Sequence, residues 1–257
     1  MRELLEAVAD GSLSPAQAEA ELNGYVTGEA GRFDAARQDR RGIPEAILAE
    51  GKSVEQVVAL AETALETTDR ALVTRVSDDQ LTALESHVES PAVSFEQWGS
   101  SVRLCTDEYE QPSLEATVGI VTAGTVDGPV ADEAEAVCVD SGATVDRVDD
   151  VGVAALDRTL DQVERFREAD ILIVAAGREG ALPTVIAGLV DTPVIGVPVS
   201  SGYGYGGDGE AALSGMLQSC TVLSVVNIDA GFVAGAQAAL LARMVSNARA
   251  DGPQQQK

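Results

Sequence analysis

The residues with the clearest chemical use in this chain follow an apolar run, Val118 to Val121, within residues 116–129. Small and polar residues come next, and Pro129 then opens a helical pattern. A buried strand that leads through a tight turn into a helix is an anion-binding device, because free backbone N–H groups and the helix dipole point at the turn. Pro129 suits the first helical position, where its missing N–H would have had no partner. The sequence therefore predicts a phosphate site, with a strand–turn–helix that binds nothing as the alternative; the candidate residues are Thr122, Gly124, Thr125 and Asp127.

Two further loops combine glycine with charged or aromatic residues. Loop 177–183 reads GlyArgGluGlyAlaLeuPro and places Arg178 and Glu179 after an apolar strand pattern, where a charge most often serves a ligand. Loop 199–209 holds five glycines and two tyrosines. Such a loop can approach a ligand closely and act as a lid, whereas the alternative is a flexible loop in solvent. Its predicted binding residues are Gly202, Tyr203 and Gly204.

The counts of cysteine and histidine limit nucleophilic and metal chemistry. Cys105, Cys138 and Cys220 are too few and too scattered for a disulfide framework or a CxxC zinc site. His87 is the single histidine and lies in a polar segment, so a catalytic triad, a Cys–His dyad or a His-based zinc site would depend on one predicted surface residue. A free cysteine is usually a small buried hydrophobe, which is the expectation for Cys105 and Cys138. Cys220 ends a predicted helix, where the dipole does not favour a thiolate, so a nucleophilic Cys220 needs another activating group.

Composition excludes several classes of function. Of 257 residues, 42 are acidic and 17 are basic, which gives a net charge of −25. The acidic residues form no block, which favours adaptation to a salt-rich cytoplasm over an acidic binding surface. The sequence shows no basic cluster that would form a nucleic-acid-binding patch, so a nucleic-acid partner is not expected. Residues 1–20 do not resemble a signal peptide, and no apolar run reaches the ~20 residues of a membrane helix, so a soluble cytoplasmic protein without a membrane partner is expected.

From Thr117 onward, apolar strand patterns alternate with helical patterns. This alternation predicts a parallel sheet covered on both faces, an α/β three-layer domain of Rossmann-like or flavodoxin-like type over residues 116–248. A polar tail, residues 249–257, follows. Ligands in such sheets bind at the carboxyl ends of the strands. The predicted strands are 117–122, 143–148, 170–176, 193–198 and 222–227, and the predicted helices are 129–141, 155–168, 180–190, 209–219 and 231–248.

Residues 1–115 are predicted to form a smaller, mainly helical α+β domain that ends in a polar linker, residues 106–115. Residues 1–70 have helical patterns, interrupted by a segment at 34–52 that is rich in arginine and glycine. Arginines of this kind can hold phosphates or carboxylates. The other predicted features are helices after the N-caps Ser14 and Ser53 and short strands at residues 71–76 and 92–95.

Taken in order, these motifs resemble the LarB family. The resemblance covers nearly the whole chain, and the family's second domain is similar to the aminoimidazole ribonucleotide carboxylase PurE. The upstream block resembles the family's N-terminal signature in Asp34, Arg37, Arg40, Gly42, Pro44, Glu45 and Ile47, with Gly51 and Lys52 following. The downstream motifs are GlyIleValThrAlaGlyThrValAspGlyProValAlaAspGluAla (119–134), AlaGlyArgGluGlyAlaLeuPro (176–183), ValIleGlyValProValSerSerGlyTyrGly (194–204), MetLeuGlnSerCys (216–220) and AsnIleAspAlaGlyPhe (227–232).

The resemblance implies an enzyme of nickel-pincer nucleotide biosynthesis. Family members carboxylate the pyridinium ring of nicotinic acid adenine dinucleotide with CO2 and cleave its phosphoanhydride, giving pyridinium-3,5-biscarboxylic acid mononucleotide and AMP. The family's nucleophilic cysteine falls on Cys220 and its active-site glutamate on Glu179. Two positions depart from the usual pattern, since Ala36 stands where a histidine is common and Arg178 where an apolar residue is common. Further implied substrate-binding residues are Asp34, Arg37, Arg40, Glu45 and Lys52.

The implied chemistry needs a thiol and a carboxylate and no obligatory histidine. Thiolate addition at carbon 4 of the pyridinium ring turns an electrophilic ring into an enamine, whose carbon 5 can take CO2. We expect Mg²⁺ for the hydrolysis, CO2 or bicarbonate as co-substrate and no organic cofactor. The family also implies a homo-oligomer, an octamer built through the α/β domain. In this chain, the predicted helix from Gly231 to Met244 is rich in small residues and is a candidate contact between copies.

Two alternatives remain open on the sequence. A purine-biosynthesis carboxylase of the PurE type would require a histidine in an AlaAlaHisLeuPro motif, and residues 176–183 contain none. A noncatalytic nucleotide-binding protein would need the glycine loops but not Cys220.

Overall fold

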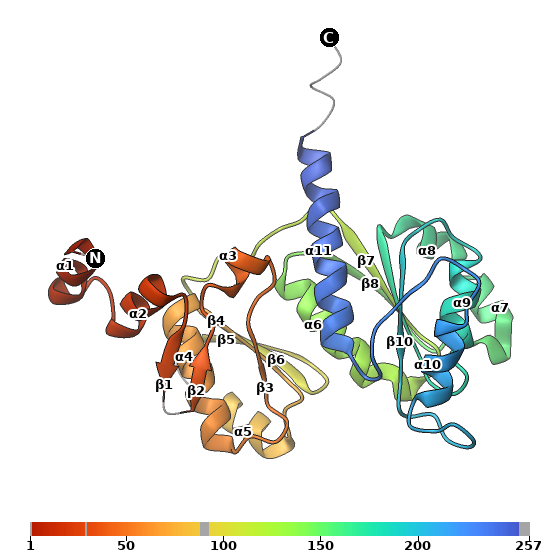
Figure 1. Ribbon diagram of the computed structural model, residues 1–257, viewed down its shortest axis with the longest axis horizontal. Helices are drawn as coiled ribbons and strands as arrows, with labels where there is room; N and C mark the ends of the chain where they lie inside the picture. The colour runs from red at the N-terminus through yellow and green to blue at the C-terminus, as the bar shows by residue number, and fades with distance from the viewer. Residues whose placement is uncertain (1, 29, 88–92, 252–257) are drawn as a thin grey trace, which may run out of the picture. The chain divides into compact units, whose positions relative to one another are not determined.

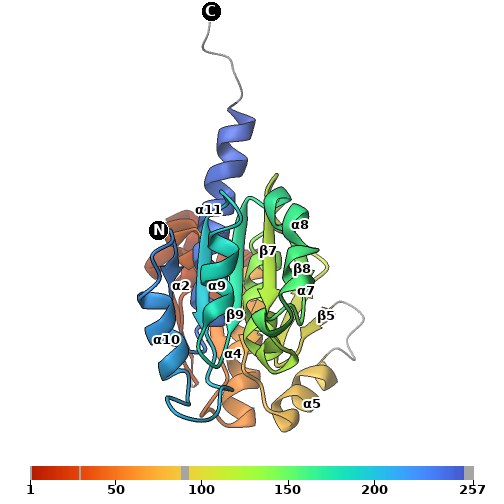
Figure 2. The ribbon, with the colours of Figure 1, turned by 90° about the vertical axis from the view of Figure 1, so that its right-hand side faces the viewer.

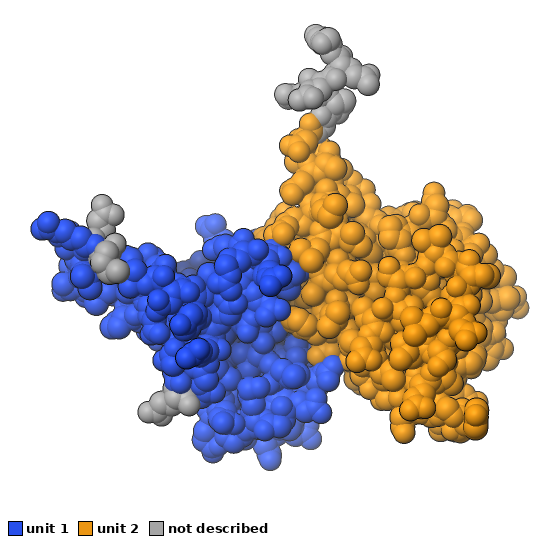
Figure 3. Space-filling model, viewed as in Figure 1, with its two compact units in different colours: residues 1–111 blue, residues 112–257 orange. Residues whose placement is uncertain are grey.

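The computed structural model describes residues 2–28, 30–87 and 93–251, without the side chains of Glu3 and His87. The chain divides into two compact units, Met1–Gln111 and Pro112–Lys257 (Figure 3). Each unit has a sheet and a hydrophobic core of its own (Figure 1). Among the described residues, no helix is both long enough and apolar enough to cross a membrane.

The described part of the second unit is built on five parallel strands, which confirms the predicted α/β three-layer fold. The order β8-β7-β9-β10-β11 is that of flavodoxin-like sheets, in which the chain reverses its direction across the sheet between β7 and β9. Loops that leave the carboxyl ends of these two strands diverge there and leave a crevice. The strands are β7 (Thr117–Thr122), β8 (Thr144–Val148), β9 (Ile171–Ala176), β10 (Val194–Pro198) and β11 (Ser224–Val225).

Helices cover both faces of this sheet (Figure 2). Ile120 and Ile173 point toward α6 and α11, whereas Val121 and Leu172 point toward the opposite helices, because successive strand side chains alternate between faces. Each such buried side chain stabilises the fold by roughly 1.5–3 kcal/mol relative to exposure. The helices are α6 (Gly128–Asp140), α7 (Leu156–Leu160), α8 (Val163–Glu168), α9 (Ala181–Ala187), α10 (Glu210–Leu217) and α11 (Gly231–Ala250), with 3₁₀ turns η1 (Thr125–Asp127) and η2 (Val153–Ala155).

Helices α6 and α11 pack closely because α11 carries small residues on its inner face. A Cβ on Gly235 would lie 2.6 Å from the carbonyl oxygen of Ala134. The small residues that we expected at a contact between copies are therefore used inside the unit. The outer face of α11 instead exposes larger apolar side chains, Val233, Leu240 and Met244.

Three predicted elements of this unit differ in extent. The predicted helix 155–168 is split into α7 and α8, with Thr159 donating to the carbonyl of Val151. The predicted strand 222–227 is reduced to the two residues of β11, since only these pair with β10 at the sheet edge. Helix α11 runs to Ala250, into the predicted polar tail, because Arg249 pairs with Asp170. Residues 252–257 of that tail lie outside the described residues.

The first unit is an α+β layer structure with the sheet order β3-β4-β6-β5. Helix α4 packs Val57 and Leu60 on this sheet. Ser14 and Ser53 cap α2 and α4 as predicted, each in a capping box. The elements are α1 (Arg2–Asp10), α2 (Pro15–Asn23), β1 (Val26–Gly28), β2 (Gly31–Phe33), α3 (Arg37–Arg41), β3 (Ala46–Leu48), α4 (Val54–Thr68), β4 (Arg70–Thr74), α5 (Asp78–His87), β5 (Val93–Trp98) and β6 (Ser101–Thr106).

The helical interpretation of residues 1–70 was wrong at β1 and β2, and no strand was predicted at β3, which lies in the segment 34–52. Strands of three residues are too short to show an alternating pattern, so their pairing is decided by the chain around them. Strand β6 also escaped prediction, because the buried Arg103 interrupts its apolar run. The predicted strands 71–76 and 92–95 correspond to β4 and β5; Ala92 lies outside the described residues, and so does the side chain of His87.

Candidate active site

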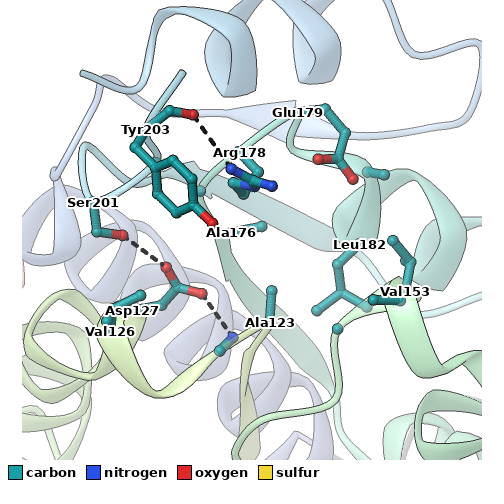
Figure 4. A pocket seen from close by; sticks show the side chains of 16 residues that line it. Ala123, Val126, Asp127, Val153, Ala176, Arg178, Glu179, Leu182, Ser201 and Tyr203 are labelled. Atoms are coloured by element: carbon teal, nitrogen blue, oxygen red, sulfur yellow. Dashed lines mark hydrogen bonds between the residues drawn. The ribbon is translucent and has the colours of Figure 1, made fainter. Parts of the chain in front are cut away.

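A cavity of about 390 Å³ opens at the carboxyl end of the parallel sheet, beside the point where the strand order reverses (Figure 4). Loops after β7, β8, β9 and β10 line it, which is the position that open α/β sheets use for ligands. Its lining residues are Ala123, Gly124, Val126, Asp127, Gly152, Val153, Ala154, Ala176, Gly177, Arg178, Glu179, Ala181, Leu182, Ser201, Gly202 and Tyr203.

Asp127 joins the loops that form this cavity. It is 2% exposed, and its carboxylate accepts from the backbone N–H of Gly124 at 2.9 Å and from the hydroxyl of Ser201 at 3.3 Å. Burial raises the pKa of Asp127, whereas hydrogen bonds from Gly124, Ser201, Ala123 and Gly177 act in the opposite direction. The side chain therefore positions three loops.

The turn that the sequence predicts to bind phosphate contributes to the lining of the cavity. Gly124 and Asp127 line it, and α6 begins immediately after η1, with Pro129 in its first turn as predicted. Thr122 and Thr125 are not among the lining residues. The hydroxyl of Thr122 is fully buried, where it donates to Asp149 and accepts from the backbone N–H of Asp150. Its observed role is to tie the end of β7 to the loop after β8.

Arg178 and Glu179 stand side by side at the mouth of the cavity, both exposed (Figure 4). The backbone of Arg178 is left-handed, with φ of 53°. Its guanidinium lies 4.2 Å from the centroid of the Tyr203 ring and donates to the carbonyl of Tyr203 at 3.4 Å. Such a stack at an exposed site is worth about 0.5–1 kcal/mol.

Loop 199–209 reaches the cavity because Gly202 lets two backbones meet. A Cβ on Gly202 would lie 2.5 Å from the backbone nitrogen of Arg178. Gly202 and Tyr203 line the cavity, whereas Gly204 does not. The glycines of this loop therefore have different uses, and Gly202 is the one that packs against the loop after β9.

Cys220 is exposed and does not line the cavity. It follows α10, and its neighbour Thr221 lies near Gly188, which ends α9. The cavity lies at the beginning of α9, so the thiol and Glu179 are separated by this helix, whose seven residues span about 10 Å. Cys105 and Cys138 are buried, as predicted.

The predicted residues of the first unit form a cluster of their own. Arg37 pairs with Glu45 at 2.8 Å and Arg40 with Asp34 at 2.6 Å, whereas Lys52 donates to the carbonyl of Leu48. Burial raises the pKa of Glu45 against the opposing effect of Arg37. Asp34 and Glu45 line a cavity of about 240 Å³ within this unit, together with Arg70 and Tyr109.

Sequence reasoning missed several lining residues. Ser201 lies in the loop that we selected, but no motif distinguished it from its glycine neighbours. Val153 and Leu182 are apolar wall residues, contributed by η2 and α9. The available signal for residues 152–154 was their place after β8 at the same sheet edge as the predicted loops.

Comparison with known proteins agrees with this architecture. Residues 25–102 match the family model described as LarB/PurE-like N-terminal domain, and residues 117–256 match that of AIR carboxylase. A protein of Methanocaldococcus jannaschii, named only as uncharacterized, is 35% identical over 254 residues, which cover 95% of this chain and 98% of the relative. Both domain matches fall in the order that the sequence motifs predict. The chain therefore belongs to the LarB family, which joins an N-terminal LarB-type domain to a C-terminal domain of the AIR carboxylase type.

Proposed function

We propose that the protein carboxylates the pyridinium ring of nicotinic acid adenine dinucleotide and hydrolyses its phosphoanhydride, forming pyridinium-3,5-biscarboxylic acid mononucleotide and AMP. The observation that carries this proposal is the cavity at the sheet edge, which combines a glycine turn at a helix N-terminus with the carboxylate of Glu179 and the guanidinium of Arg178. Its volume lies in the range of small-molecule sites, roughly 300–1,000 Å³. The mononucleotide half of the substrate is assigned to the cavity, and the adenylate half to the surface of loop 199–209.

Glu179 has the chemistry that the carboxylation requires. After a thiolate forms a bond to carbon 4 of the ring, the electron pair of the resulting enamine forms the bond from carbon 5 to CO2. Loss of the proton from carbon 5 to a carboxylate and departure of the thiolate restore the aromatic ring. We assign proton acceptance to Glu179, because its carboxylate stands at the mouth of the cavity.

The position of Cys220 leads us to place the thiol of a second copy at this site. Cys220 is separated from its own cavity by α9, but it is exposed between two exposed apolar side chains, Leu217 and Val222. Exposed apolar patches mark interaction surfaces. A homo-oligomer in which this patch covers a neighbour's cavity brings thiol, ring and Glu179 together, and the outer face of α11 offers further apolar contact area. An octamer remains our proposal for the full assembly.

Magnesium fits this proposal as a partner of the substrate phosphates. No group of three or more His, Cys, Asp or Glu side chains gathers around one point in the described residues. Mg²⁺ is usually held in nucleotide sites by one or two carboxylates together with phosphate oxygens and water, so the substrate phosphates would supply ligands for it. The ion would supply charge neutralisation at the phosphoanhydride.

A PurE-type purine carboxylase is the weaker candidate. The residues that line the cavity include no histidine, and the chain's single histidine belongs to the first unit.

The test is incubation with nicotinic acid adenine dinucleotide, bicarbonate and Mg²⁺ in molar KCl, with the products identified by mass spectrometry. We expect AMP and a mononucleotide that is heavier than nicotinic acid mononucleotide by the mass of one CO2. Cys220→Ser should bind the dinucleotide but form no carboxylated product, because a hydroxyl stays protonated at neutral pH. Cys138→Ala and Cys105→Ala are the matched controls and should remain active. Turnover of aminoimidazole ribonucleotide, or of no substrate, would contradict the proposal.

A further inference from the structure

The Arg178–Tyr203 pair is the one cation–aromatic stack among the lining residues of the cavity in the described structure. Arg178 is also the sole cationic side chain in that lining. The carboxylates of Asp127 and Glu179 share the cavity with it. An anionic group of a ligand is therefore repelled by two side chains and attracted by one.

The backbone of Arg178 gives a second, independent observation. A left-handed conformation is unfavourable for a long side chain, and strained residues of this kind concentrate at ligand sites. Gly202 packs directly against the backbone of Arg178, where a Cβ would lie 2.5 Å from the Arg178 nitrogen. The guanidinium lies over the Tyr203 ring, at the mouth and next to Glu179 (Figure 4).

The stack leaves the edge of the guanidinium available for a planar anion. Arginine has five N–H donors in a fixed fork that matches a carboxylate. Among described residues, the single hydrogen bond recorded for this side chain goes to the carbonyl of Tyr203. The Tyr203 ring covers one face of the guanidinium, whose central carbon lies 4.2 Å from the ring centroid. The turn at Gly124 is a separate place for the phosphate, so Arg178 is left for the other anionic group of a nucleotide.

We propose that Arg178, stacked on Tyr203, selects the acid form of the substrate ring by pairing with the ring carboxylate, so that the site prefers nicotinate nucleotides to nicotinamide nucleotides. This inference rests on the proposed function for the class of ligand. The amide form has the same size and the same phosphate but lacks the negative charge. A carboxylate that pairs with the guanidinium is therefore the group that distinguishes the two ligands.

The experiment measures dissociation constants of nicotinic acid mononucleotide and nicotinamide mononucleotide by calorimetry in molar KCl, without bicarbonate. We expect wild-type protein to bind the acid about 10- to 100-fold more tightly. Arg178→Leu should bring the ratio to about 1 by weakening the acid alone. Arg178→Asn tests the same loss with a residue that tolerates the left-handed backbone. Arg167→Leu, which removes an exposed arginine outside the cavity, should keep the wild-type ratio.

Tyr203 provides a test of the stack itself. Tyr203→Phe keeps the ring and should keep the ratio, whereas Tyr203→Ala should lower it. Equal weakening of both ligands by Arg178→Leu and Arg178→Asn would assign Arg178 to the phosphate and overturn the inference, as would an unchanged ratio or wild-type protein that binds neither ligand. The proposed function fails by a different result, the absence of carboxylated product from wild-type protein, and the binding ratio is measured independently of turnover.

Discussion

The hydroxyl of Ser201 donates a hydrogen bond to Oδ1 of Asp127 at 3.3 Å, although 74 positions separate the two residues in the chain. The same carboxylate accepts from the backbone of Gly124 at 2.9 Å. The loops after β7 and β10 are thus held together beneath the mouth of the cavity. A carboxylate that is occupied in this way shapes the site, and the free polar groups at the mouth remain for the ligand.

The stability contributed by Asp127 should depend on pH. Burial raises its pKa in the folded protein, so this contribution is complete below the ordinary aspartate pKa of about 3.9 and is lost as the pH rises through the folded value. The free energy of unfolding of the wild-type protein should therefore exceed that of Asp127→Asn by more at pH 4 than at pH 7. Urea unfolding in molar KCl at both pH values measures the difference in free energy of unfolding. Asp157→Asn, at an exposed position, controls for the loss of one charge, and a pH-independent difference would contradict the prediction.

Activity should be restored by mixing two inactive variants if copies share the site. Cys220→Ser and Glu179→Gln each remove one group, and random mixing in a symmetric oligomer leaves about a quarter of the sites with both groups intact. We expect co-refolded equimolar variants to recover about a quarter of wild-type activity. Each variant refolded alone should stay inactive. A mixture without activity would place both groups in the same chain.

Gly202→Ala should weaken nucleotide binding by displacing the glycine-rich loop. The new Cβ would lie 2.5 Å from the backbone nitrogen of Arg178, so the two loops must separate. We expect at least a tenfold loss of affinity, about 1.4 kcal/mol, with little change in the thermal midpoint. Gly207→Ala is the matched control from the same loop, since its Cβ finds its nearest neighbour at an ordinary 3.4 Å. Equal affinity of both variants would show that the close approach at Gly202 is not needed.

Reactivity toward a thiol reagent should separate the three cysteines. Cys220 is exposed, whereas burial raises the pKa of the Cys138 thiol to about 12 and Cys105 is also buried. Iodoacetamide at pH 8 should modify Cys220 in the native protein and all three cysteines after unfolding. Peptide mass spectrometry identifies the sites. Modification of Cys138 in the native protein would contradict the burial.

Salt should stabilise the fold. With a net charge of −25, self-repulsion opposes the compact state in dilute buffer and is screened in molar KCl, where the Debye length falls to about 3 Å. We expect the thermal midpoint to rise with KCl concentration. The control is a neutral osmolyte at the same molar concentration as KCl, because it adds solute without screening charge. An unchanged midpoint would remove the argument for adaptation to salt.

The sequence by itself predicted the parallel sheet well, because β7, β9 and β10 are apolar runs buried on both faces. Local chemistry was also sufficient for Ser14 and Ser53, since a helix cap depends on groups within one turn. The alternation of strands and helices in the sequence also placed Gly124, Arg178 and Glu179 at the carboxyl edge of the parallel sheet. Short strands such as β1 and β3 could not be predicted, because partners distant in sequence decide their pairing.

Only the tertiary structure decided what each candidate contacts. Asp127, a predicted phosphate-site residue, lines the cavity but is 2% exposed, and its carboxylate accepts from Ser201, which arrives from another strand. The small residues of α11 were expected to meet a second copy, but they meet α6, since close packing depends on which faces the crossovers bring together. Cys220 and Glu179 both belong to motifs that the resemblance assigns to catalysis, yet α9 separates them in space. The sequence determines which groups are available for chemistry, whereas the directions of the strands and helices determine which of them can act on one ligand.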